Sequence, residues 1–402
     1  MPTNRSRPPV SPEWELILLA VQPQPSARDL QAIISDSVQI SFDWNRCHRM
    51  AAAHGVSALV HRRLHPHIAA IPAPEIWDHW TAECKAEGFC NLTRLVELRR
   101  VIEACDQRRI PQLVVKGPVL GACLYGDVAL RPFGDLDLVV PVEERERAID
   151  CLADLGFVPQ FQLTRSERSR FFRRYSELHF TSATTGTMVD LHWELVSHRY
   201  ESAHLLDGYW QRATTVQIGS MTLRTLSTHD LFVFLLLHAA KHEWRCLGWL
   251  VDLAWLEARQ AQFDWNRLCD DAARRGVSKI VRIGRRLNER LFDAQGIRET
   301  GAPTERYDSL VEEILEGLSC DIAIIKPPHR WPWQRIYSRA LDRVRDKLRY
   351  VYDILLAPTP LEWQTIPLPV GTTWLYPLIR IWRLLVKYAF ARNPDSQRKS
   401  RR

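Results

Sequence analysis

The stretch that decides the fold is KGPVLGACLYGDVALRPFGDLDLVV, residues 116–140. It reads as the end of a strand, a glycine turn, a helix, a loop, and then a strand that carries two aspartates. Pro118 suits the first position of a helix, where its missing N–H costs nothing. Asp135 and Asp137 are two residues apart on the last strand, so their side chains point to the same face. The stretch therefore predicts a small α/β unit with paired carboxylates on one strand.

A third carboxylate follows on a later predicted strand. Residues 188–193, MVDLHW, read as a strand with Asp190 at its centre. If this strand pairs beside the first, the carboxylates of Asp135, Asp137 and Asp190 converge. Such oxygen ligands suit Mg²⁺, and three of them are enough to hold two ions that activate an attacking oxygen and stabilise a leaving pyrophosphate. An Asp-x-Asp pair can also be a simple capping turn, but the third aspartate favours a metal site.

Taken together, these motifs resemble the uncharacterised nucleotidyltransferase family, a branch of the DNA polymerase β-like nucleotidyltransferase superfamily. The residues that carry the resemblance are Lys116-Gly117, Leu124-Tyr125-Gly126, Arg131, Gly134 to Val140, and Asp190-Leu191-His192-Trp193. The resemblance implies an α+β fold, with a small mixed β-sheet core flanked by N-terminal and C-terminal α-helical segments. It also implies a transferase that moves NMP from an NTP such as ATP to an acceptor and releases pyrophosphate.

The resemblance assigns roles to individual residues. Asp135, Asp137 and Asp190 would be catalytic and would ligate two Mg²⁺ ions, and Gly117 would lie against the nucleotide phosphates. One departure is Pro118, because the superfamily usually has Ser or Gly after this glycine and proline offers neither an N–H nor a hydroxyl.

Two cations near this turn are further candidates. We expect Lys116 and Arg131 to compensate for the missing phosphate donor, with a purely structural role as the alternative for each.

Four further side chains are candidates for the edge of the cleft. They are His192, two residues after the third aspartate, and His238, Lys241 and His242 on a predicted helix. A zinc site at the two helical histidines would need a third ligand that the pattern does not supply. The alternatives are a half-buried structural histidine and a solvated helix face. Glu177 and His179, on the preceding predicted strand, are taken as structural.

Composition sets the broad class of protein. The chain has 402 residues and a net charge of +7, which suits a polyanionic ligand such as a nucleotide but is too small to argue for nucleic acid. The nine cysteines form no Cys-x-x-Cys pair and follow no signal sequence, so we expect reduced thiols and a cytoplasmic protein. No apolar stretch is long enough for a transmembrane helix. The expected partners are an NTP and an acceptor that is a small molecule, a peptide or a protein.

The chain divides into several expected regions. They are a flexible tail over 1–10, an N-terminal helical segment over 11–108, a nucleotidyltransferase core over 109–226, a C-terminal helical domain over 227–357, a proline-rich connector with a docked amphipathic helix over 358–391, and a basic tail over 392–402. The motif FDWNR occurs twice, at 42–46 and 263–267, each time followed by Gly-Val-Ser in the same register. This repetition indicates either one helical hairpin used twice or two hairpins with common capping residues.

The C-terminal helix expected over 374–390 has an apolar face with basic residues off that face. Such a helix can pack its apolar face on the helical domain, or lie on an anionic membrane surface. The short length and the proline-rich connector favour packing over membrane contact.

A second class of function stays open beside the enzyme. A catalytically silent nucleotide-binding protein or scaffold could use the same fold, because fold alone does not establish activity. The presence of all three aspartates favours the enzyme.

Overall fold

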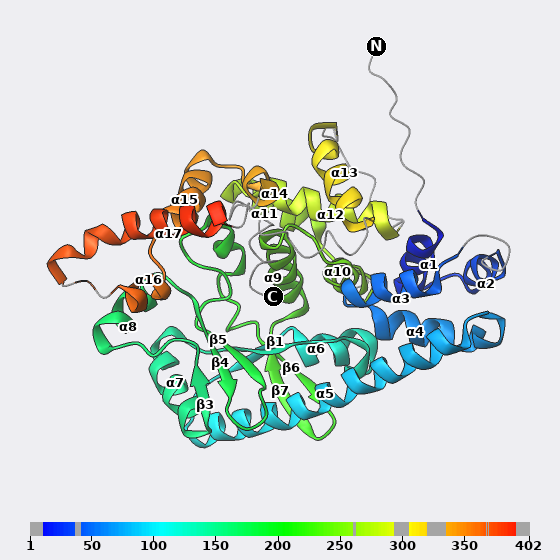
Figure 1. Cartoon of the computed structure of the whole chain (residues 1–402), viewed down its shortest axis with the longest axis horizontal. Coiled ribbons are helices and arrows are strands. Elements are labelled where there is room, and N and C mark those ends of the chain that lie inside the picture. Colours follow the sequence, from blue (N-terminus) through cyan, green and yellow to red (C-terminus); the bar gives the residue numbers. More distant parts are fainter. Residues whose placement is uncertain are drawn as a thin grey trace, which may run out of the picture. The chain divides into compact units, whose positions relative to one another are not determined.

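The computed structural model describes residues 11–36, 42–259, 263–292, 305–319, 335–366, 368 and 370–390 (Figure 1). The chain divides into two compact units, residues 1–162 with 175–325, and residues 163–174 with 326–402. This division differs from the expected regions, because 163–174, from the middle of the predicted core, groups with the C-terminal residues.

The first unit is built on a five-stranded sheet. Its strands are β1 (Leu113–Val115), β2 (Asp135–Val139), β3 (Phe157–Pro159), β4 (Glu177–Ser182) and β5 (Met188–His192). Their order is β1-β2-β5-β4-β3, and β2 and β5 are parallel while the other neighbours are antiparallel. Most residues of the central strands β2 and β5 are buried. The expected small mixed sheet flanked by helices is confirmed.

Short elements connect these strands. They are α6 (Gly117–Leu120), the π-helical turn η2 (Gly121–Tyr125), η3 (Val128–Leu130), η4 (Val142–Glu144), α7 (Arg145–Asp154) and η5 (Glu201–Leu206). Strands β6 (Thr214–Ile218) and β7 (Met221–Thr225) form a separate antiparallel hairpin.

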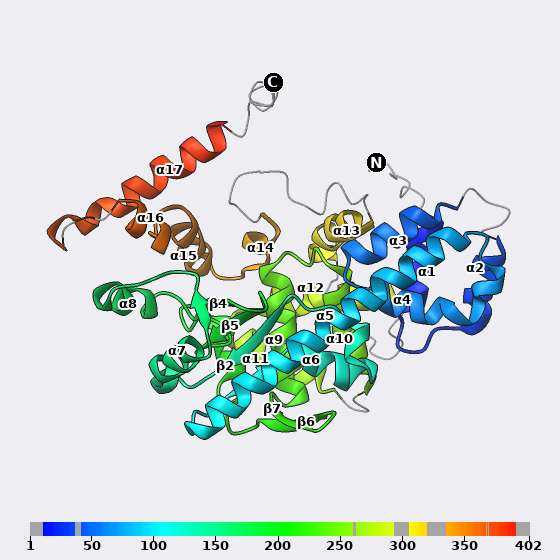
Figure 2. The same cartoon turned by 60° about the horizontal axis from the view of Figure 1, so that its bottom comes forward.

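Helices precede and follow the sheet in the first unit. Those before it are α1 (Pro12–Val21), α2 (Ala27–Asp36), α3 (Trp44–Ala53), α4 (Ser57–Leu64), η1 (His65–Ala70) and α5 (Pro74–Gln107). Those after it are α9 (Thr228–Lys241), α10 (Leu247–Arg259), α11 (Trp265–Arg275), α12 (Ser278–Phe292) and α13 (Glu305–Ser319). The long helix α5 contacts α3 and α4 and also β2 and α7, so it joins the N-terminal helices to the sheet (Figure 2).

The repeated motif forms the same local structure twice. Asp43 caps α3 by accepting a hydrogen bond from the Arg46 amide at 2.9 Å, and Asp264 caps α11 in the same way from the Arg267 amide at 2.9 Å. Both following glycines adopt a φ of 67°, and each leads into a second helix, α4 or α12. The capping and the glycine turn predicted for both hairpins are confirmed.

The second unit is helical in the part that the structure describes. Its elements are α8 (Arg165–Phe172), α14 (Arg335–Ala340), α15 (Val344–Leu355), α16 (Pro360–Thr365), η7 (Val370–Leu375) and α17 (Tyr376–Phe390). Residues 341–343 separate α14 from α15. The expected tails over 1–10 and 392–402 lie outside the described residues.

The C-terminal helix α17 packs on α15 and α16, but not through its apolar face. Arg380 and Arg383 approach the fully buried carboxylate of Glu362, at 3.4 and 2.6 Å. Trp374, at the end of η7, and Leu378, Trp382 and Leu385 on α17 are more than half exposed. The two arginines compensate the buried carboxylate, and part of the apolar face of the helix stays exposed. Among the described residues, no helix is both long and apolar enough to span a bilayer.

Candidate active site

Two aspartates face each other across neighbouring parallel strands. Strands β2 and β5 are in register so that Asp137 pairs with Asp190. Potential ligand atoms of Asp137, Asp190 and His192 lie within 4.8 Å of one another. Because side chains two residues apart on a strand share a face, Asp135 points to the same side of β2 as Asp137. The structure thus brings Asp137, Asp190 and His192 together, while Asp135 lies on the same face of β2.

Asp137 is the most deeply buried of the three aspartates and is closely partnered. Lys116 Nζ lies 2.6 Å from its Oδ1 atom, and His192 Nε2 lies 3.1 Å from the same oxygen. Burial alone would raise the pKa of Asp137, but the Lys116 ammonium and the contact with His192 outweigh burial and hold this pKa well below its usual range. Asp137 therefore carries a negative charge at neutral pH.

Asp135 lies at the more exposed start of the same strand. Burial raises the pKa of Asp135, and the charges of Asp137 and Asp190 raise it further, while Lys116 partly offsets these effects. Repulsion among neighbouring carboxylates is the physical reason. A cation placed among the three would relieve it.

The turn that carries Lys116 has an uncommon backbone conformation. Lys116 adopts φ 55° and ψ −137°, and Gly117 adopts φ 26°. A Cβ atom on Gly117 would also meet the Phe133 ring at 3.4 Å. The helix α6 that follows has only four residues, so the helix dipole available at the expected phosphate site is small. The Lys116 side chain is directed to Asp137, with its ammonium 5.7 Å from the Phe234 ring centroid.

Strand β4 supplies two site residues that the sequence analysis took as structural. Antiparallel pairing places Glu177 opposite His192 and His179 opposite Asp190. Glu177 Oε2 lies 3.1 Å from His192 Nδ1, and His179 Nδ1 lies 2.6 Å from Asp190 Oδ1. The signal in the sequence was the pair of motifs Glu-Leu-His and Asp-Leu-His, which pair an acid with a histidine twice in antiparallel register.

Comparison with known proteins gives the family. The sequence profile described as uncharacterised nucleotidyltransferase matches residues 41–293, which is well over half of the 402 residues. The chain belongs to this family. No curated protein matches it.

One solved structure is similar to part of this nucleotidyltransferase family member. It is that of the antibiotic-resistance factor ANT(2'')-Ia, which matches over 56% of this chain and 99% of its own, with 15% sequence identity and a TM-score of 0.31. At this TM-score the likeness carries no argument about the fold or the site.

The acidic face has the donors that a nucleotidyltransferase needs for Mg²⁺. Asp137 and Asp190 offer carboxylate oxygens close to one another, and Asp135 adds a third carboxylate to the same face. Oxygen donors in this number suit a cation that keeps several waters and shares its remaining positions with phosphate. His192 is nearby but is engaged by Asp137 and Glu177. These residues fit the ion that the family implies.

Helix α9 brings the other predicted cleft residues to this site. Lys241 lies 3.9 Å from Glu177, and His238 and His242 contact each other, with ring centroids 4.7 Å apart. Burial, followed by the nearby Lys116 charge, lowers the pKa of His238. Burial also lowers the pKa of His242 to about 4, with Lys241 adding to the effect. Both rings are therefore neutral at pH 7, and their roles toward a substrate stay predictions.

Arg131, predicted to bind nucleotide, is engaged inside the protein. Its guanidinium lies 3.0 Å from Asp252 of α10, and Tyr125 donates a hydrogen bond to the same carboxylate at 2.7 Å. Asn91 of α5 donates to the carbonyl oxygens of Val128 and Arg131, at 2.9 and 3.1 Å. These contacts fix the loop before the Asp-x-Asp strand. A nucleotide contact of Arg131 stays a prediction, and it would require the guanidinium to be shared with Asp252.

Proposed function

We propose that this family member is a Mg²⁺-dependent nucleotidyltransferase that moves NMP from an NTP to an acceptor. An acceptor oxygen forms a bond to the α-phosphorus, the bond between this phosphorus and the β-phosphate oxygen breaks, and pyrophosphate leaves with the electron pair. The observation that supports the proposal most is the parallel register that sets Asp137 beside Asp190, with Asp135 on the same face.

Each acidic side chain has a distinct part in this proposal. Asp135 and Asp137 would hold both ions, and Asp190 would hold the ion next to the acceptor. When bound, Mg²⁺ would neutralise phosphate charge and lower the pKa of the acceptor oxygen. Asp190 can accept the acceptor's proton, and His179 supports it by the 2.6 Å contact between Nδ1 and Oδ1.

The neighbouring residues position these groups. Glu177 contacts one nitrogen of His192, whose other nitrogen contacts Asp137, so the three side chains form a chain from β4 to β2. Such contacts fix the orientation of a metal-binding carboxylate. Lys116 would contact phosphate once the negative charge of Asp137 is shared with a metal ion, and Gly117 would leave room for that phosphate. His238, Lys241 and His242 would border the acceptor.

The experiment is a transfer assay with each of four α-labelled NTPs. The purified chain is incubated with Mg²⁺ and with a small-molecule or a protein fraction of a lysate, and both the label and the released pyrophosphate are followed. We expect label to move to an acceptor from at least one NTP, and to stay in the NTP with Asp190→Asn. Transfer that persists in Asp190→Asn would contradict the proposal.

A second candidate is a silent nucleotide-binding protein. Two observations favour it. Pro118 follows the glycine and offers no N–H, and Lys116 already contacts the carboxylate of Asp137. Binding of an NTP by calorimetry, with no pyrophosphate released in any lysate fraction, would support this candidate over the enzyme.

A further inference from the structure

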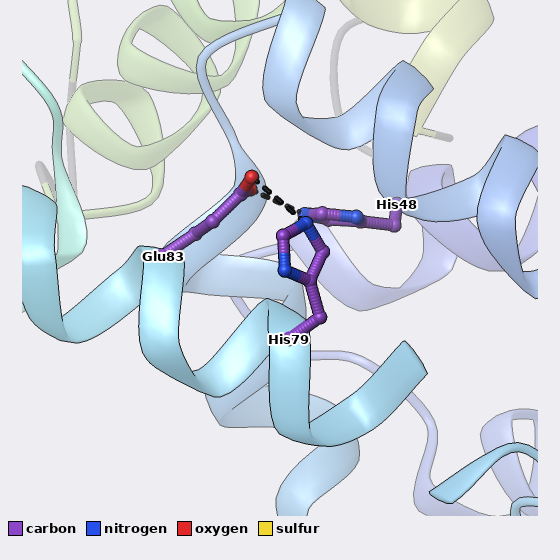
Figure 3. Close-up of side chains that lie close together, drawn as sticks. All are labelled: His48, His79 and Glu83. Carbon is purple, nitrogen blue, oxygen red and sulfur yellow. Dashed lines mark ion pairs between the residues drawn. The ribbon is translucent and has the colours of Figure 1, made fainter. Parts of the chain in front are cut away.

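A second cluster of acid and histidine side chains lies away from the catalytic sheet, between α3 and α5. It consists of His48 on α3 and of His79 and Glu83 on α5 (Figure 3). His79 and Glu83 are four residues apart, so they lie on one face of α5, one turn apart. Potential ligand atoms of all three residues lie within 4.8 Å of one another.

The carboxylate of Glu83 contacts both imidazole rings. Its Oε2 atom is 2.8 Å from His48 Nε2, and its Oε1 atom is 3.1 Å from His79 Nε2. Figure 3 shows both rings directed toward this carboxylate. Tetrahedral zinc with bonds near 2.1 Å places its ligand atoms about 3.4 Å apart, so only small shifts separate this arrangement from a coordination shell.

His48 gives an independent indication of a ligand. The residue is only 6% exposed, and its Nε2 atom lies 2.8 Å from the Glu83 Oε2 atom. A buried imidazole nitrogen that faces a carboxylate at this distance is placed to share a metal ion with it. Packing against the Trp80 ring, with centroids 4.8 Å apart, holds the imidazole in this orientation.

The charge state of the cluster also suits a metal. Burial lowers the pKa of His48, although the Glu83 carboxylate acts in the opposite direction. The neutral imidazole is the form that binds metal ions. The side chains of His79 and Glu83 are 65% and 49% exposed, so a metal ion can reach the cluster from solvent and keep a water as its fourth ligand.

We propose that His48, His79 and Glu83 form a Zn²⁺ site with two nitrogen ligands and one carboxylate ligand. The site joins α3 to α5, where His79 and Glu83 lie 12 and 8 residues before Asn91, which holds the loop in front of the Asp-x-Asp strand. Zinc here fastens the N-terminal hairpin to the helix that supports the catalytic sheet. It takes no part in nucleotidyl transfer, and the proposal is independent of the proposed function.

The test is zinc binding by the full chain. The metal-free protein is titrated with Zn²⁺ against a chromophoric chelator, in millimolar Mg²⁺ so that the oxygen-rich catalytic site is not the one measured. We expect one tight equivalent for the unaltered chain. Loss of one ligand in His79→Ala or Glu83→Gln should weaken it by at least about tenfold. Both residues are exposed, so these variants should fold, which circular dichroism checks.

Two control variants make the result specific. Glu194 and the exposed His198 form another pair four residues apart, 2.6 Å from each other, and no second histidine joins them in a metal-ligand group among the described residues, so His198→Ala should bind zinc as the unaltered chain does. Asp190→Asn should also keep the tight equivalent. Unchanged zinc affinity in both His79→Ala and Glu83→Gln, or its loss in Asp190→Asn, would overturn the proposal.

Discussion

The first unit holds two clusters of acid and histidine that differ in composition and surroundings. At the sheet, carboxylates dominate, Asp137 is buried, and a lysine contacts it at 2.6 Å. Between α3 and α5, two imidazoles share one carboxylate, and two of the three side chains are largely exposed. The type of donor atom, and not the acid–histidine pairing alone, therefore determines which metal ion each cluster suits. Oxygen donors suit Mg²⁺, and imidazole donors suit Zn²⁺.

The sharpest way to separate the two clusters is to change Asp190→Asn. If Asp190 holds Mg²⁺ as proposed, nucleotidyl transfer should fall by about 10³-fold or more, because a metal ligand that stabilises transition-state charge contributes several kcal/mol. The fold should persist, since the His179 partner of Asp190 is 45% exposed and can be hydrated. Steady-state kinetics measure the loss. Near-normal turnover in Asp190→Asn would contradict a catalytic role of Asp190.

A smaller loss is expected from Glu177→Gln. The substitution keeps the shape of the side chain but weakens the contact that orients His192 against Asp137. Outer partners of metal-binding groups typically contribute 10- to 100-fold, so transfer should fall by about that factor while zinc binding stays unchanged. The same assay measures it, with the apparent affinity for Mg²⁺ as a second readout. If the transfer rate and the apparent affinity for Mg²⁺ are both unchanged, Glu177 has only a structural role.

The pH dependence of stability tests the pair formed by His179 and Asp190. The hydrogen bond to Asp190 raises the pKa of His179 above its usual value, despite an opposing effect of burial. A raised folded-state pKa contributes stability that is fully present below the unfolded pKa of about 6.5 and is lost as the pH rises through the folded pKa. The unaltered chain should therefore melt above His179→Gln at pH 6, and the gap in melting temperature should close at alkaline pH. A gap that widens with pH would contradict this assignment.

The smallest effect on catalysis is expected at the other cluster. His79→Ala should change nucleotidyl transfer by no more than about a factor of two, because independent distant sites couple by only about 0.3–0.5 kcal/mol. Zinc binding should fall in the same variant, so the two clusters would respond in opposite ways to the changes at Asp190 and His79. A large loss of nucleotidyl transfer in His79→Ala at saturating Mg²⁺ would contradict this independence and indicate that the two clusters act together.

Alternation along the chain was enough to predict the central site. Asp135 and Asp137 had to share a face because strand side chains alternate, and Asp190 joins them only because its strand pairs beside theirs, which the sequence analysis stated as a condition. The helix caps at Asp43 and Asp264 could also be predicted from the sequence. An aspartate just before a helix accepts a hydrogen bond from a backbone amide of the first turn, and this contact needs no distant residue.

The remaining features depend on contacts that no local pattern contains. Lys116 turns to Asp137 because its backbone has a positive φ, which periodicity does not reveal. Glu177 and His179 enter the site through an antiparallel register that is fixed only when β4 and β5 pair. Arg131 meets Asp252 across 121 residues of sequence. Such long-range pairings are decided by packing, and so the sequence predicted the acidic centre but not its surroundings.

The ion pair between Lys116 and Asp137 has a consequence for how the protein is made. The Lys116 ammonium is a counter-ion that belongs to the chain itself. It compensates the negative charge of Asp137, the most buried carboxylate of the site, before any metal ion binds. A small zinc-dependent domain, by contrast, stays unfolded until its metal binds. For the proposed reaction, the supply of magnesium would then govern turnover, and the amount of folded protein would not depend on it.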